Sequence, residues 1–75
     1  MPQAPEEEIK KLSKRIKQVR KERKMTQADV ADVLNISDGH YRKIENGMMN
    51  PGYLSLVKLC AALEISIEDF FKGFK

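Results

Sequence analysis

Basic side chains are the residues of this 75-residue chain best equipped for chemistry, and most of them fall in one segment. Residues 10–24 contain most of the 14 lysines and arginines, with Glu22 as the only acid among them. Such a segment fits a polyanionic partner such as nucleic acid. A solvated helix face that keeps a protein in solution has the same pattern, so charge alone leaves both interpretations open.

Catalysis and metal binding find little support in the residue types. The chain has one histidine, His40, and one cysteine, Cys60, with no carboxylates at metal-ligand spacing around them. No combination of nucleophile, base and orienting group is present, which predicts a protein that is not an enzyme and needs no cofactor. Cys60 lies in the apolar run 59–63, which favours a buried small hydrophobe over a redox crosslink. A single cysteine also excludes an intrachain disulfide.

Composition favours one soluble helical domain. Apolar residues make up 41% of the chain and charged residues 33%, which is typical of a folded rather than a disordered segment. No apolar run approaches the roughly 18 residues of a membrane span. Residues 1–8 show no basic-then-apolar signal pattern, so we expect a cytoplasmic protein without a membrane partner.

The stretch 25–47 organises the chain as two short helices joined by a tight turn. Thr26 is suited to cap the first of them, and Ser37 the second. Asp29 occupies the usual Glu position of a capping box, so we expect that box to be only approximate. Asn46-Gly47 ends the second helix, because Gly adopts the left-handed conformation without steric cost. A compact wedge of this kind places one helix in the DNA major groove.

Apolar spacing predicts an all-α domain with five helices, at about 6–23, 27–34, 38–46, 53–63 and 67–71. Residues 1–5 are expected to be flexible, and residues 6–75 to form the single domain. The apolar positions of the first, second and fourth helices are expected to face inward, and Phe70 to join them. These positions are Ile9, Leu12, Ile16 and Val19, then Ala28, Val30, Ala31, Val33 and Leu34, then Tyr53, Leu56, Leu59, Cys60 and Leu63.

The predicted helix at 38–46 has a thin apolar stripe. Only Tyr41 and Ile44, three residues apart, are candidates to face inward. Its other side chains are polar or small. This pattern favours a helix whose outer face is kept for a partner.

These motifs together resemble the Cro and phage-repressor class of helix-turn-helix regulators, often called XRE-like. Met25-Thr26-Gln27 followed about seventeen residues later by Ile44-Glu45-Asn46-Gly47 is a specific combination. The likeness runs from about Leu12 to Phe71, and the small size is similar to that of restriction–modification controllers. The remaining matching residues are Lys14-Arg15-Ile16, Val19-Arg20, Ala31, Leu34, Ile36-Ser37, Asn50-Pro51, Leu59, Ala62-Leu63, Ile65-Ser66 and Phe70.

The resemblance implies roles in binding double-stranded DNA. Gln27 is expected to contact a phosphate and brace the recognition helix, whereas a solvent-facing Gln is the plainer alternative. Lys43 is expected to donate to guanine, and Asp38 either to accept from cytosine or only to stabilise its helix. Further residues expected at base edges or phosphates are Gly39, His40, Arg42, Lys14, Arg15, Asn46, Met49 and Asn50.

The resemblance also implies a structural ion pair between Arg20 and Glu45 that locks the recognition helix to the first helix. The chain departs from the family in two places. Asp38-Gly39 replaces longer polar residues at the start of the recognition helix, so direct base contacts are fewer. Glu64 stands where a helix-ending Gly is common.

We therefore expect a transcription regulator, a repressor or autoregulator, that binds a palindromic operator as a homodimer. Leu54, Val57, Phe71 and Phe74 are the candidates for the dimer contact. The same apolar residues leave a second interpretation open. In it, the chain is an antitoxin or another protein-binding module for which DNA binding is secondary.

Overall fold

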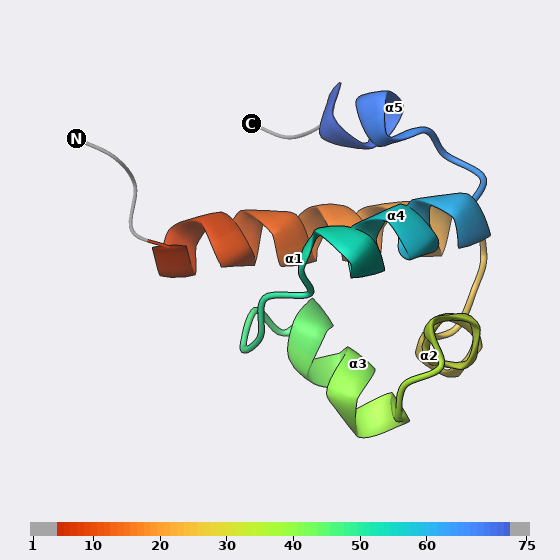
Figure 1. Ribbon diagram of the computed structural model, residues 1–75, viewed down its shortest axis with the longest axis horizontal. Coiled ribbons are helices and arrows are strands. Elements are labelled where there is room, and N and C mark those ends of the chain that lie inside the picture. Colours follow the sequence, from red (N-terminus) through yellow and green to blue (C-terminus); the bar gives the residue numbers. More distant parts are fainter. Residues whose placement is uncertain (1–4, 73–75) are drawn as a thin grey trace.

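A computed structural model describes residues 5–72 of the chain, and within that range it forms helices joined by short loops (Figure 1). The all-α architecture with five helices predicted from the sequence is confirmed. The helices are α1 (Pro5–Glu22), α2 (Gln27–Leu34), α3 (Asp38–Glu45), α4 (Tyr53–Ala62) and α5 (Ile67–Lys72).

Helix α1 begins one residue earlier than predicted. Pro5 is its first residue, a position that Pro fits because the first-turn amides have no intrahelical partner in any case. Three acids, Glu6, Glu7 and Glu8, follow in the first turn and suit the positive end of the helix dipole. Residues 1–4, for which we predicted flexibility, lie outside the described residues.

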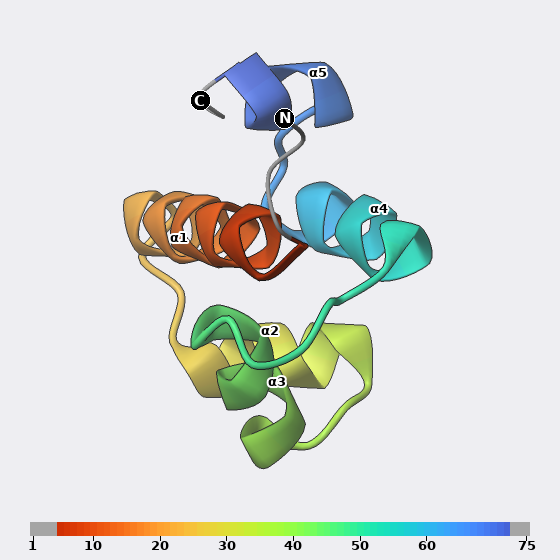
Figure 2. The ribbon, with the colours of Figure 1, turned by 90° about the vertical axis from the view of Figure 1, so that its left-hand side faces the viewer.

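The helices form three layers, seen most clearly in Figure 2. Helices α1 and α4 occupy the middle layer, α5 lies on one side of it, and α2 and α3 lie on the other. Helices α2 and α3 pack against each other, α2 also against α4, and α3 against α1. The outer face of α3 is therefore at one end of the molecule and α5 is at the opposite end.

One apolar core connects the layers. Phe70 of α5 is fully buried in it, as the sequence predicted, and removing such side chains from water is the main stabilising contribution in a domain this small. The described core residues are Ile16, Val19, Val30, Ala31, Leu34, Tyr41, Ile44, Leu56, Leu59, Cys60, Leu63 and Phe70.

Three residues predicted to face inward are exposed, namely Ala28, Val33 and Tyr53. Helix α2 buries the stripe formed by Val30, Ala31 and Leu34, and Ala28 and Val33 lie roughly 100° or more around the helix from its centre. Tyr53 is the first residue of α4, where it is 67% exposed.

Local hydrogen bonds cap the N-termini of both α2 and α3. The Thr26 hydroxyl accepts from the amide of Asp29 at 3.0 Å, and the Asp29 carboxylate accepts from the amide of Thr26 at 2.9 Å. The capping box is therefore complete, and our expectation of an approximate one was wrong: the shorter Asp side chain reaches the N-cap amide. Asn35 adopts the left-handed conformation, and the Ser37 hydroxyl caps α3 by accepting from the amide of His40.

Helix α4 ends at Ala62, one residue before the predicted boundary. Glu64 follows with a φ of 55°, the left-handed conformation for which Gly is usual. The Arg23 guanidinium donates to the Glu64 carbonyl oxygen at 3.2 Å, so the strained residue is tied to the end of α1. Among residues 5–72, no helix combines the length and the apolar character needed to cross a membrane.

Candidate nucleic-acid interface

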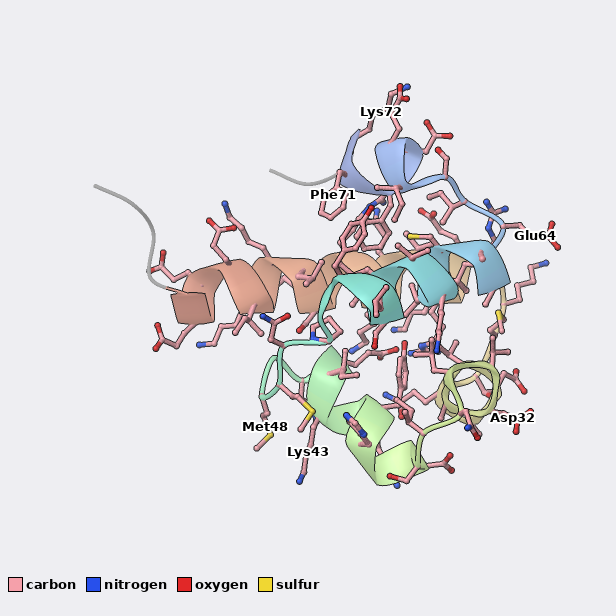
Figure 3. The ribbon with its side chains drawn as sticks, viewed as in Figure 1. Asp32, Lys43, Met48, Glu64, Phe71 and Lys72 are labelled. Atoms are coloured by element: carbon pink, nitrogen blue, oxygen red, sulfur yellow. The ribbon has the colours of Figure 1, made fainter. Side chains whose placement is uncertain are left out.

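Helix α3 separates its side chains cleanly between core and solvent. Tyr41 and Ile44 are buried, at 0% and 2% exposure, whereas Asp38, Gly39, His40, Arg42 and Lys43 are exposed. Figure 3 shows Lys43, and Met48 in the loop after α3, pointing away from the layer of α1 and α4. The outer face of α3 is therefore a projecting polar surface with two cations near its C-terminal end.

A buried carboxylate fixes α3 to the two preceding helices. Glu45 accepts from the Arg20 guanidinium at 2.5 Å (Nε to Oε2) and 3.1 Å (Nη2 to Oε1), so the ion pair that the resemblance implied is present and bidentate. It also accepts from Gln27 Nε2 at 3.2 Å and from the Tyr41 hydroxyl at 2.5 Å. Arg20 in addition donates to the Met25 carbonyl oxygen at 2.8 Å. Side chains from α1, α2 and α3 thus converge on one group.

The electrostatics of this cluster favour the ion pair. Burial alone would raise the pKa of Glu45, but hydrogen bonds from Arg20, Tyr41 and Gln27 outweigh it and hold the pKa below its usual range. The hydrogen bond to Glu45 raises the pKa of Arg20 above its ordinary value. Burial, aided by Glu45, raises the pKa of Tyr41 far above that of a free phenol. Glu45 is therefore stable as the carboxylate, Arg20 as the charged guanidinium and Tyr41 as the neutral phenol.

A hollow of about 530 Å³ lies where α2 begins beside α3. Amides in the first turn of a helix that remain unpaired attract anions. Arg42 adds a cation to this hollow and Asp38 adds an acid, whereas Arg20 is already paired with Glu45. Gln27, which is half-buried, contributes its amide to the wall. The residues around the hollow are Arg20, Met25, Thr26, Gln27, Ala28, Asp38 and Arg42.

A second hollow, of about 260 Å³, lies between the first half of α1 and the end of α3. Lys10, Lys14 and Asn46 line it together with Ser13, Glu45 and Gly47. Gly47 has a φ of +74°, and a Cβ built there would stand 3.1 Å from Lys10 Cγ. The absence of a side chain at Gly47 thus leaves room for the methylene groups of Lys10. Lys10 was not among the residues predicted to contact DNA.

The predicted phosphate-contacting residues do not all lie together. Lys14 and Asn46 line the second hollow, whereas Arg15 packs on α5 and donates to the carbonyl oxygens of Phe70 and Asp69. Met49 is half-buried against the core. Asn50 accepts from the Gly52 amide with its side chain, which shapes the loop before α4.

Two buried polar contacts of α3 were not predicted from the sequence. The Tyr41 hydroxyl was assigned only an apolar role, although Tyr and Glu four residues apart on one helix face are neighbours. The Ser13 hydroxyl donates to the Ile44 carbonyl oxygen at 2.6 Å and thereby ties α3 to α1. The signal in the sequence is the position of Ser13, four residues after Ile9 and three before Ile16, which places it on the apolar stripe. A hydroxyl buried there, as it is at 3% exposure, needs a hydrogen-bond partner.

Metal or thiol chemistry has no visible basis in the described residues. Between residues 5 and 72, no group of three or more His, Cys, Asp or Glu side chains could hold a metal ion. Cys60 is buried at 2% exposure, and burial raises the pKa of its thiol. The thiol is therefore the unreactive form of a small core residue.

A family model for helix-turn-helix domains matches residues 16–70, which include α2, its turn and α3. The chain belongs to the helix-turn-helix family. Among solved structures, this helix-turn-helix protein is similar to a point mutant of the restriction–modification controller protein C.Esp1396I. The two chains share 33% sequence identity and a TM-score of 0.82, over 89% of this chain and 85% of that chain. No curated protein matches the chain.

The resemblance to XRE-like helix-turn-helix regulators seen in the sequence is confirmed by these two matches. Helices α2 and α3, with the turn 35–37, form the helix-turn-helix unit. Family membership and the controller-protein neighbour support a DNA-binding transcription regulator.

Proposed function

We propose that this helix-turn-helix protein is a repressor or autoregulator that binds a palindromic operator as a homodimer. Each protomer places α3 in the major groove of one half-site. The observation that carries the proposal is the division of α3 between two buried apolar residues and an exposed polar face. The similarity to a restriction–modification controller protein supports a regulatory role.

Base recognition is assigned to the exposed residues of α3. Lys43 donates to the guanine acceptors O6 and N7, and Asp38 is placed to accept from a cytosine amino group. His40 and Arg42 reach base edges or flanking phosphates. Gly39 offers no side chain, so part of the specificity comes from DNA shape.

Phosphate contacts set the register of α3 in the groove. Gln27 binds one phosphate at the start of α2, where a hollow meets the helix N-terminus. Lys14 and Asn46 bind another at the second hollow, with Met49 and Asn50 following in the loop. Arg15 is left out of the proposed DNA contacts because its guanidinium is engaged with α5.

Dimerisation is proposed because one wedge covers too little DNA for tight specific binding. Leu54, Val57 and Phe71 are exposed apolar residues, at 76%, 38% and 38%, on α4 and α5. Phe74, the fourth residue predicted at the contact, lies outside the described residues. Control of occupancy then comes from protein concentration and dimerisation. The proposed location is the cytoplasm.

Selection of bound sequences from a random duplex pool tests the proposal. A palindrome with half-sites about one helical turn, or ~34 Å, apart is the expected product. Lys43→Ala, which removes a side chain pointing into solvent, should select a pool with relaxed preference at one position of each half-site. Sedimentation of the free protein should show a dimer. A wild-type pool that shows no enrichment at low salt contradicts the proposal.

A second candidate function is an antitoxin or another protein-binding module, favoured by the exposed apolar residues of α4 and α5. Under this alternative the isolated chain is monomeric and shows no salt-dependent DNA binding. Measuring the oligomeric state and the salt dependence of DNA affinity on the same sample separates the two functions.

A further inference from the structure

Tyr41 is fully buried, yet its ring carries a hydroxyl into the interior of the domain. An apolar residue would fill the core without the cost of burying a polar atom. The hydroxyl has a hydrogen-bond partner, because it donates to Glu45 Oε2 at 2.5 Å. Both residues belong to α3, so this bond does not itself join two helices. Its effect must pass through the carboxylate.

The Glu45 carboxylate has its hydrogen-bonding capacity filled. Oε2 accepts from Arg20 Nε and the Tyr41 hydroxyl, and Oε1 accepts from Arg20 Nη2 and Gln27 Nε2. The two oxygens offer about four acceptor positions, and each oxygen accepts two hydrogen bonds, so all of these positions are used. Only 1% of the Glu45 side chain is exposed, and water therefore cannot replace a lost donor easily. The four bonds together fix the rotation of the carboxylate.

Gln27 is the outermost member of this network. Its amide nitrogen gives one hydrogen to Glu45 at 3.2 Å, which orients the amide and leaves the second hydrogen for another acceptor. The side chain also borders the hollow at the start of α2, beside Asp38 and Arg42 of the helix assigned to base recognition. Its orientation therefore bears directly on the surface assigned to DNA.

We propose that Tyr41 is a positioning residue for DNA binding: its hydroxyl fixes the Glu45 carboxylate, which holds the Gln27 amide in place for a DNA phosphate. This inference rests on the proposed function. It assigns Tyr41 a role beyond filling the core, because losing the hydroxyl frees the carboxylate to turn and releases Gln27. The ion pair between Arg20 and Glu45 remains when the Tyr41 hydroxyl is lost.

Tyr41→Phe is the test variant, since it removes one oxygen atom and keeps the ring. Tyr53→Phe is the matched control, because it removes the same atom from a residue that is 67% exposed. With the duplex selected by the wild-type protein, Tyr41→Phe should bind about tenfold more weakly, the scale of one hydrogen bond to a charged group. Tyr53→Phe should bind as the wild type does.

Gln27→Ala separates positioning from a merely structural effect. In a Gln27→Ala background, Tyr41→Phe should weaken binding by less than about twofold, because the residue that it positions is absent. The loss of melting temperature caused by Tyr41→Phe should persist in that background. An equal loss of affinity with and without Gln27, or no loss in the single variant, overturns the proposal.

NMR of the free protein tests the same chain of contacts without DNA. The two side-chain amide hydrogens of Gln27 should have well-separated resonances in the wild type, with one protected from exchange. Tyr41→Phe should bring them close to those of a free amide, and Tyr53→Phe should not. If the wild-type spectrum shows a free Gln27 amide, or if Tyr41→Phe leaves it unchanged, the proposal is wrong. If the wild type selects no DNA sequence, the proposed function fails, and the NMR result still decides whether Tyr41 positions Gln27.

Discussion

The Arg15 guanidinium lies 5.5 Å from the centre of the Phe70 ring and donates a hydrogen bond of 2.6 Å to the carbonyl oxygen of the same residue. A second bond of 3.0 Å reaches the Asp69 carbonyl oxygen. Carbonyls in the last turn of a helix have no intrahelical partner, and a cation satisfies them well. Arg15 thus fastens α5, a helix of six residues, to α1.

Arg15→Gln should lower the free energy of unfolding by about 1–2 kcal/mol, because it removes charge-assisted bonds to the α5 carbonyls. Urea denaturation measures this effect. The salt dependence of DNA binding should not change. Lys14→Gln, which removes the neighbouring cation, should have the opposite pair of effects. The free energy of unfolding should stay the same, and the slope of log affinity against log salt should fall by about one. Equal effects of the two substitutions would contradict this division of roles.

Glu45→Ala should unfold or loosen the domain more than it alters base preference. Removing one member of a buried ion pair leaves Arg20 unpaired, at a cost of ~3–5 kcal/mol. That is a large share of the stability of a small domain. Thermal melting followed by circular dichroism measures it. An unchanged melting temperature would show that the pair has no structural role.

Acid should weaken the fold through Glu45. Its pKa is lower in the folded state than in the unfolded chain, so its contribution is present in full above the unfolded value of about 4.3. The contribution is lost as the pH falls toward the lowered folded value. Urea midpoints between pH 7 and pH 2 should show this decline. Glu22→Gln, which removes an exposed carboxylate, should show the same decline of the urea midpoint at acid pH. Glu45→Gln should flatten that decline.

Glu64→Gly should stabilise the protein by about 1 kcal/mol, because Glu64 has a φ of 55° and only Gly adopts that conformation without strain. The hydrogen bond from Arg23 uses the backbone carbonyl and is retained. For a domain of this size, the melting temperature should rise by roughly 4–8 °C. Glu64→Ala serves as the control, because it removes the same side chain and keeps the strain. If it gave the same rise, backbone conformation would not be the cause.

Gly39→Ala should raise stability by roughly 0.5–1 kcal/mol, since Gly39 lies in a helix and a Cβ there meets nothing within 4 Å. Affinity for DNA should stay within about twofold, because the proposed contacts come from neighbouring side chains. Calorimetry and gel-shift titration of the same preparation measure both. A stabilised variant that binds DNA poorly would mean that the DNA comes too close to Gly39 for a methyl group.

Local signals in the sequence predicted much of the fold. The bounds of α2 were correct because Thr26 and Asn35 mark its ends with recognisable caps. The inward positions of Ile16 and Val19 in α1 followed from their spacing. The inward positions predicted for Ala28, Val33 and Tyr53 were wrong, because apolar spacing does not show which neighbouring element covers a helix face.

Contacts between distant residues could not be obtained in this way. Arg15 resembled its basic neighbours in the sequence, and only the packing of α5 separates it from Lys14. Tyr41 was assigned to the core because of its apolar ring, and that assignment left its hydroxyl out of account. Whether a polar group is paired depends on three-dimensional arrangement, and sequence spacing reports only its neighbours along one helix.

The exposed residues of α3 take no part in the apolar core, which is built from the opposite face of the helix and from the other layers. Substitutions there change the groups offered to DNA while the fold keeps its stability. A lineage carrying this domain can therefore move to new operators through a series of folded intermediates, one exposed position at a time. For the same reason, these positions are the place to build libraries for altered specificity.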